Sequence, residues 1–161
     1  MIRLRLPALT SAMVGLLLLG ACIDSSGPET VELQVIEETN FAAVLGIDLA
    51  SMTKTSSGLY IGTITEGTGE PAALRDLVTV TYSGYLADGA LFDSSDLGGP
   101  ITFELGIGQV VQGFDEGITG MKLGGIRNIV IPPSLGYGSQ TRGAIPGGSI
   151  LVFRVELQSI G

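Results

Sequence analysis

QVVQGFDEG, at residues 109–117, is the one segment of this chain whose apolar residues follow the spacing of an α-helix. One face of that helix would carry Val110, Val111, Phe114, Ile118 and Met121. Glycines between positions 120 and 125 end the pattern. The segment and the aromatic stretches at 82–84 and 92–95 gather apolar side chains around glycine turns, which favours an apolar pocket as the working part of the protein.

Elsewhere the periodicity is that of β-strands separated by turns. Alternating apolar and polar residues predict strands at 59–65, 77–85, 92–95, 101–105, 126–132 and 150–157. A long loop rich in glycine and proline, residues 133–148, holds Tyr137 and Ile145 and joins the last two strands. Because a lone apolar helix must bury its face, we expect an α+β domain in which one antiparallel sheet wraps around that helix.

Composition excludes several classes of function. The chain has 161 residues, of which 25 are glycine, and it contains no histidine. Histidine is the commonest general base and metal ligand, so its absence argues against a catalytic triad and a zinc site, and we expect no cofactor or metal. The formal net charge is −8, whereas phosphate binding needs clustered lysine and arginine, so we expect no nucleic-acid partner.

The start of the chain has the layout of an export signal. Arg3 and Arg5 precede an apolar run at 7–19, which is shorter than the roughly 20 residues that span a bilayer. Leu19-Gly20-Ala21-Cys22 resembles the lipobox of bacterial lipoproteins, in which the cysteine is acylated and becomes the new amino terminus. We expect residues 1–21 to be a signal peptide and the product to be a membrane-anchored lipoprotein on the periplasmic or cell-surface side of a bacterial membrane. The alternative is an ordinary signal-peptidase site with an incidental cysteine.

Residues 22–57 are expected to form a tether followed by an N-terminal extension. The first part has nothing to bury, but the rest is too apolar for a linker. Residues 31–35 alternate like a strand, and residues 41–45 fit a short helix behind a candidate cap, Asn40. We expect the extension to pack on the main domain, which then comprises residues 58–161.

Few side chains could carry acid–base or covalent chemistry. Asp115 and Glu116 are adjacent on the predicted helix and point in different directions, so we expect both to be solvated. Asp93 lies between an aromatic residue and a serine pair, and we interpret it as a group that orients a neighbour rather than as a general acid. Ser94 and Ser95 lack a partner base and a Gly-x-Ser-x-Gly elbow, which argues against nucleophilic catalysis.

A series of ordered motifs resembles those of FKBP-type peptidyl-prolyl cis/trans isomerases. The motifs lie at 78–84, 88–95, 103–106, 110–114, 133–138 and 145–146. The resemblance covers the main domain as defined above. It implies a half-open antiparallel β-sheet curled around one short α-helix, with a pocket between them that accelerates rotation about X-Pro bonds.

The resemblance also implies roles for individual residues, with Tyr82, Asp93, Phe114 and Tyr137 as the catalytic set. Phe114 takes the pocket-floor position, often tryptophan in the family, against which the proline ring rests. Tyr137 would donate its hydroxyl, the backbone N–H of Val111 would meet a substrate carbonyl, and Asp93 would hydrogen-bond Tyr82. The substrate-binding walls would be Phe92, Ile101, Phe103, Val110, Val111, Ile145 and Phe153, with Ile101 standing where an aromatic residue is common.

The implied partners are proline-containing unfolded or partly folded polypeptides, with macrolides as candidate inhibitors and the membrane as the site of anchoring. No heptad pattern supports a dimer, so we expect a monomer. Two other readings stay open: a non-catalytic chaperone or peptide-binding module on the same fold, and a structural lipoprotein whose aromatic residues are only core. An X-Pro isomerisation assay separates the first of these from an enzyme.

Overall fold

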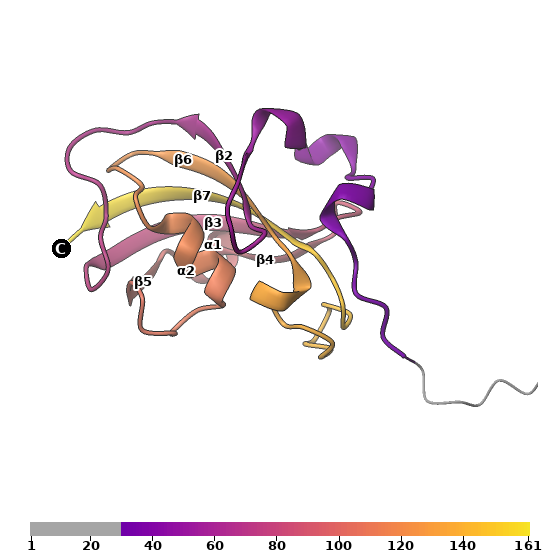
Figure 1. Ribbon diagram of the computed structural model, residues 1–161. Coiled ribbons are helices and arrows are strands. Elements are labelled where there is room, and N and C mark those ends of the chain that lie inside the picture. Colours follow the sequence, from indigo (N-terminus) through magenta and orange to yellow (C-terminus); the bar gives the residue numbers. More distant parts are fainter. Residues whose placement is uncertain (1–29) are drawn as a thin grey trace, which may run out of the picture.

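The computed structural model describes residues 30–161, so the expected signal peptide and Cys22 lie outside the described residues. A seven-stranded antiparallel sheet dominates it, in the order β1-β2-β6-β7-β3-β4 with β5 paired to β3 (Figure 1). The strands are β1 (Thr53–Lys54), β2 (Tyr60–Thr65), β3 (Leu77–Leu86), β4 (Leu91–Ser94), β5 (Ile101–Glu104), β6 (Ile126–Ile131) and β7 (Leu151–Ile160). Within this range no helix has the length and apolar character needed to cross a membrane. The predicted α+β class, an antiparallel sheet around a short helix, is confirmed.

Strand β3 divides between two partners along one of its edges. Residues 77–80 pair with β5, and residues 83–85 pair with β4. The opposite edge pairs with β7 from Val78 to Leu86. Because neither β4 nor β5 pairs with Thr81 or Tyr82, the backbone there needs another hydrogen-bond partner.

Helix α2 (Gln112–Ile118) packs across β6 and β7. The strand side chains that face it form the main core, which includes Ile129, Ile131, Leu151, Phe153, Val155 and Leu157. Gly113 and Gly117 permit this close approach. A Cβ at these positions would lie only 2.4 Å from Cγ2 of Ile131 and 2.6 Å from Cδ1 of Ile129, whereas carbon atoms in contact prefer about 3.5 to 4.0 Å.

The helix is shorter than its apolar pattern predicts. Val110 and Val111 precede it, with Val111 as the extended N-cap residue, and the buried Met121 follows it. Arg127 closes the far end of the helix through its guanidinium. It donates hydrogen bonds of 2.9, 3.1 and 3.1 Å to the carbonyl oxygens of Gly117, Thr119 and Gly120. These bonds satisfy carbonyl groups that a helix end leaves without a partner.

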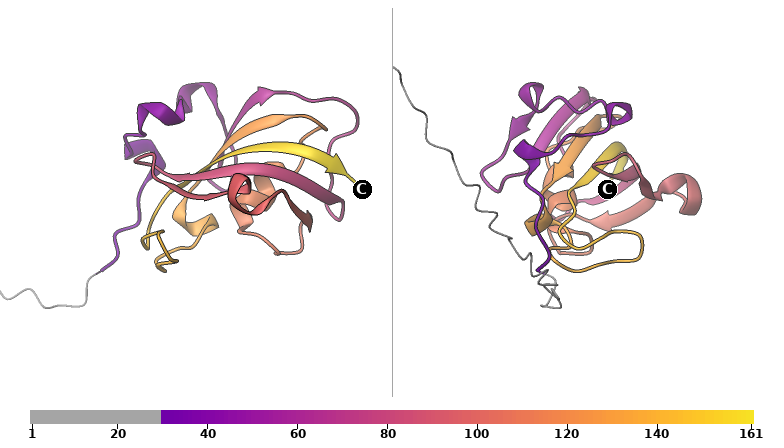
Figure 2. Two further views of the ribbon diagram at one scale, coloured as in Figure 1. Left: turned by 180° about the vertical axis from the view of Figure 1, so that it is seen from behind. Right: turned by 90° about the vertical axis from the view of Figure 1, so that its right-hand side faces the viewer.

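The N-terminal extension covers the face of the sheet that α2 leaves open (Figures 1 and 2). It contains three 3₁₀ helices, η1 (Ile36–Glu38), η2 (Ala43–Leu45) and η3 (Leu49–Ser51), before β1 adds to the sheet. A second apolar cluster forms beneath it, composed of Ile36, Tyr60, Val130, Ile150 and Val152. Around this cluster pack Phe41, Leu45, Ile47, Leu49, Met52 and Tyr85. The sheet is therefore buried on both faces over β6 and β7.

Two details predicted for the extension are wrong. Residues 31–35 form no strand, because within the described chain their backbone joins no ladder, and the alternating Val31, Leu33 and Val35 remain about half exposed. The helix at 41–45 is only the 3₁₀ turn η2, whose N-cap is Ala42 and has no side-chain capping bond. Apolar contact with the sheet, rather than capping, holds this segment in place.

Candidate active site

A hollow of about 200 Å³ lies where α2, β3 and the loops around the helix meet. Its lining comprises Tyr82, Asp93, Ile101, Gln109, Val110, Val111, Phe114, Tyr137 and Phe153. The sequence places these residues on widely separated segments, and the fold brings them together because β3 and β7 are neighbours and α2 crosses them.

Phe114 forms the bottom of this hollow. Its side chain is only 3% exposed, yet it lines the cavity. Its ring centroid lies 5.7 Å from that of Tyr82, 6.0 Å from that of Phe103 and 4.9 Å from that of Phe153. Tilted and edge-on contacts of this kind are the favourable geometries for aromatic pairs. The ring is thus held rigidly with part of its surface free for a guest.

Tyr82 and Asp93 form the hydrogen-bonded pair at one wall. The Tyr82 hydroxyl donates to Oδ2 of Asp93 at 2.7 Å, and the Ser94 N–H donates to Oδ1 at 2.9 Å. Burial, followed by the hydrogen bond to Asp93, raises the pKa of Tyr82 to about 12. Tyr82 therefore remains a neutral donor at physiological pH, and the carboxylate of Asp93 serves as its acceptor.

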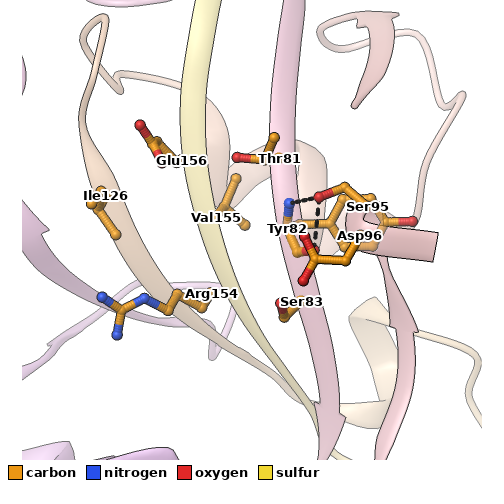
Figure 3. Close-up of a pocket in the computed structure, with 9 residues that line it drawn as sticks. All are labelled: Thr81, Tyr82, Ser83, Ser95, Asp96, Ile126, Arg154, Val155 and Glu156. Atoms are coloured by element: carbon orange, nitrogen blue, oxygen red, sulfur yellow. Dashed lines mark hydrogen bonds between the residues drawn. The ribbon is translucent and has the colours of Figure 1, made fainter. Parts of the chain in front are cut away.

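Ser95 supplies the backbone partner that β3 lacks at Tyr82. It is the first residue of the four-residue helix α1 (Ser95–Gly98), a helix that the sequence pattern did not predict. Its Oγ accepts from the Tyr82 N–H at 3.0 Å and donates to the Tyr82 carbonyl at 3.2 Å (Figure 3). The buried Ser95 hydroxyl thus makes the backbone hydrogen bonds that a neighbouring strand would otherwise make, and it fixes the position of Tyr82.

A second hollow, of about 230 Å³, lies beside Ser95, and Figure 3 draws the residues that line it. Its lining includes Thr81, Arg154 and Glu156, whose side chains alternate along β3 and β7 with those facing α2. It therefore lies on the other face of the sheet. Tyr82 is the one aromatic residue in its lining, which otherwise mixes polar with apolar groups, whereas Tyr82, Phe114, Tyr137 and Phe153 all line the hollow around Phe114. The hollow around Phe114 is therefore the better candidate site.

Asp115 is not solvated, contrary to the prediction. It is only 9% exposed, and its two carboxylate oxygens accept from the Gly106 N–H at 2.8 and 2.9 Å. This contact ties the start of α2 to the turn after β5, and so holds the segment that carries Val110 and Val111. Glu116 is half-buried and its Oε1 accepts from the Ser57 hydroxyl at 2.7 Å.

Polar groups at the cavity wall remain available to a ligand. Within residues 30–161, neither the N–H of Val111 nor the hydroxyl of Tyr137 has a hydrogen-bond partner. The Tyr137 ring is covered by the guanidinium of Arg142, 5.8 Å from its centroid. Across the same residues, no three His, Cys, Asp or Glu side chains are placed to hold a metal ion. The site offers an apolar surface and neutral donors rather than an acid–base pair.

Three residues expected in the walls are not among those that line this hollow. Phe103, 5% exposed, supports Phe114, and Ile145, 7% exposed, belongs to the main core. Phe92 packs on Phe153 with ring centroids 5.5 Å apart. Conversely, Gln109 lines the cavity and was not predicted, and its Oε1 accepts from the N–H of Glu104 at 2.8 Å. The sequence signal that could have identified Gln109 is its position directly before Val110, which was expected to line the pocket.

Comparison with known proteins identifies the class. The family described as FKBP-type peptidyl-prolyl cis-trans isomerase matches residues 68–158. An FK506-binding protein of Neisseria meningitidis serogroup B is 46% identical over 105 residues, covering 64% of this chain and 96% of that protein. FK506-binding protein 4 of Mycosarcoma maydis is 38% identical over 132 residues, covering 82% of this chain, which spans only 33% of that longer protein.

Solved structures agree with this assignment. FkpA from Escherichia coli superimposes with a TM-score of 0.64 at 40% identity, over 68% of this chain and 51% of that one. AtFKBP13 superimposes with a TM-score of 0.64 at 35% identity, over 68% of this chain and 98% of that one. The chain belongs to the FKBP-type peptidyl-prolyl cis-trans isomerases.

Proposed function

We propose that this protein accelerates cis/trans rotation of X-Pro bonds in exported proteins, using the hollow floored by Phe114. The observation that carries the proposal is a nearly buried phenyl ring that still faces a cavity, beside donors on Val111 and Tyr137 that have no hydrogen-bond partner in residues 30–161. The family membership supports the reaction, and the apolar lining supports proline as the residue bound.

The chemistry asked of such a site is modest. Rotation breaks amide resonance and crosses a barrier of about 18 to 20 kcal/mol, which takes tens to hundreds of seconds unaided. The twisted amide is less polar than the planar one, so a pocket that removes water from the planar carbonyl and fits the twisted form lowers the barrier. Shortening about a hundred seconds to about ten milliseconds requires roughly 5 to 6 kcal/mol.

Individual residues would divide this task. The proline ring would rest on Phe114, and the N–H of Val111 and the hydroxyl of Tyr137 would bind carbonyl groups on either side of the rotating bond. Asp93 would orient Tyr82 through their hydrogen bond, without exchanging a proton with the substrate. No step needs a general base, which agrees with a chain that has no histidine.

A protease-free isomerisation assay on a short X-Pro peptide, with and without a macrolide such as rapamycin, tests the proposal. We expect catalysis at substoichiometric protein concentration and inhibition by the macrolide. Saturable peptide binding without any acceleration would support a peptide-binding chaperone on this fold and refute the enzymatic role.

We further propose that the enzyme acts outside the cytoplasm as a lipoprotein anchored through Cys22. The support is the charged, apolar and small-residue order that ends at this sole cysteine. In cells that express the full chain, Cys22→Ser should move the protein from the membrane to the soluble fraction, with isomerase activity unchanged. Membrane retention of the serine variant would contradict the anchor.

A further inference from the structure

Gln34, in the segment before η1, is bonded to the base of the loop that follows Tyr137. Its N–H donates to the carbonyl oxygen of Gly148 at 2.9 Å, and its side-chain Oε1 accepts from the N–H of Ile150 at 2.9 Å. Residues 34 and 150 are 116 positions apart in the chain. Gln34 is therefore hydrogen-bonded to the loop at both residues that flank Ser149.

The loop surface is shaped to receive this segment. A Cβ on Gly148, which has a φ of +80°, would lie 2.4 Å from the carbonyl oxygen of Glu32 and 3.1 Å from Cγ1 of Val31. A Cβ on Gly147 would lie 3.3 Å from the same Val31 atom. Any larger residue at 148 would push the segment away, so Gly148 allows the two backbones to lie against each other here. Gly147 is needed mainly for the loop itself, because its Cβ would lie 2.2 Å from the carbonyl oxygen of Ser139.

The contact continues from the loop base to the candidate active site. The Gly148 N–H donates to the carbonyl oxygen of Gly138 at 2.7 Å, and the Gly138 N–H donates to that of Pro133 at 2.8 Å. Gly138 directly follows Tyr137, which lines the cavity. On the other side, Ile36 is 3% exposed and anchors the segment in the second apolar cluster. Gln34 thus lies between a fixed anchor and the turn that sets the position of Tyr137.

We propose that Gln34 is a positioning residue for the isomerase site, acting through Gly148 and Gly138 on Tyr137. The family match begins at residue 68, so this assigns part of the active-site architecture to a segment outside the recognised domain. The inference rests on the proposed function, since its effect is measured on X-Pro isomerisation.

Gln34→Ala in the full-length protein removes the acceptor for the Ile150 N–H. A single hydrogen bond contributes about 1 kcal/mol, so we expect kcat/KM to fall about threefold to tenfold. Amide hydrogen exchange at Gly148 and Ile150 should quicken by a similar factor. Gln34→Glu keeps an acceptor oxygen and should restore both values. The matched control is Glu38→Ala, an exposed change in η1 whose side chain makes no hydrogen bond within the described chain.

A Tyr137→Phe background separates positioning from general stabilisation. If Gln34 acts through the Tyr137 hydroxyl, Gln34→Ala should lower kcat/KM by less than twofold in that background. An equal loss in both backgrounds, or unchanged kcat/KM with faster amide exchange, would overturn the inference. A wild-type protein with no isomerase activity would instead refute the proposed function itself, which keeps the two failures distinct.

Discussion

Replacing Phe114 with alanine tests the floor of the pocket directly. The side chain is 3% exposed and contacts three other aromatic rings, and truncation of such a residue costs about 3 to 5 kcal/mol of folding free energy. Domains of this size are stable by about 5 to 15 kcal/mol, so the variant should remain largely folded at moderate temperature. Activity should suffer more than the folded fraction.

The expected kinetic loss follows from the surface that the ring offers a proline. A ring face that covers about 60 Å² of substrate contributes about 1.5 kcal/mol at 25 cal/mol per Å², or about tenfold in rate. Water that enters the emptied floor would resolvate the amide and deepen the loss. We therefore expect kcat/KM per folded molecule to fall at least about tenfold.

Ile118→Ala is the matched control for Phe114→Ala. Ile118 is fully buried on the same helix but does not line the cavity, and its truncation costs about 2 to 5 kcal/mol. Urea unfolding gives the folded fraction of each variant, and the protease-free peptide assay gives kcat/KM. If the two variants show equal activity per folded molecule, Phe114 is not the pocket floor and the reasoning fails.

Three further changes probe the site and its supports. Because burial raises the pKa of Tyr82 from 10.0 to about 12, Tyr82→Phe should remove a tyrosinate absorbance step near pH 12, and removal of a step near pH 10 instead would contradict this. The stability linked to the protonated hydroxyl is full below pH 10 and is lost as the pH rises through 12. The pKa of Glu37 is lowered from 4.5 to about 2 by its hydrogen bonds to Lys54 and Tyr60, so the stability that these bonds add to η1 should be full above pH 4.5 and be lost as the pH falls through 2. Glu37→Gln should abolish this pH dependence of amide exchange in η1. Gly113→Ala should destabilise the protein by about 1 to 3 kcal/mol, since its Cβ would collide with Ile131. Gly98→Ala is the control, because its Cβ would meet no atom within 4 Å. Equal urea unfolding midpoints for the two variants would show that α2 can move away from Ile131 and would contradict the prediction.

Periodic features of the chain were predictable, because they reflect burial of one face. The alternation along β3 and β7 located both strands, and the spacing of Phe114 and Ile118 located α2. The order of strands in the sheet left no such signal. Motif resemblance, rather than periodicity, identified the cavity residues, and it also placed Phe103 and Ile145 in the walls, although both are core residues that do not line the hollow.

Features set by long-range partners could not be read from the sequence. Asp115 is buried because Gly106 offers it an N–H, and adjacency to Glu116 carries no information about that contact. The hydrogen bond from the Ile150 N–H to Gln34 joins the last part of the main domain to the N-terminal extension, 116 positions earlier in the chain. Residues 31–35 show the reverse error, since their alternation resembles that of a strand, but no strand of the described chain pairs with them.

The N-terminal extension that covers β6 and β7 determines where this protein can be truncated. A fragment that starts at residue 68, where the family match begins, would lack β1, β2 and the three 3₁₀ helices η1, η2 and η3 of the extension. Val130 and Val152, 0% and 3% exposed in the whole protein, would then meet water beside an unpaired edge of β6. Bare apolar sheet with a free edge is a template for aggregation. Recombinant versions should therefore start upstream of Ile36, well before the homology boundary.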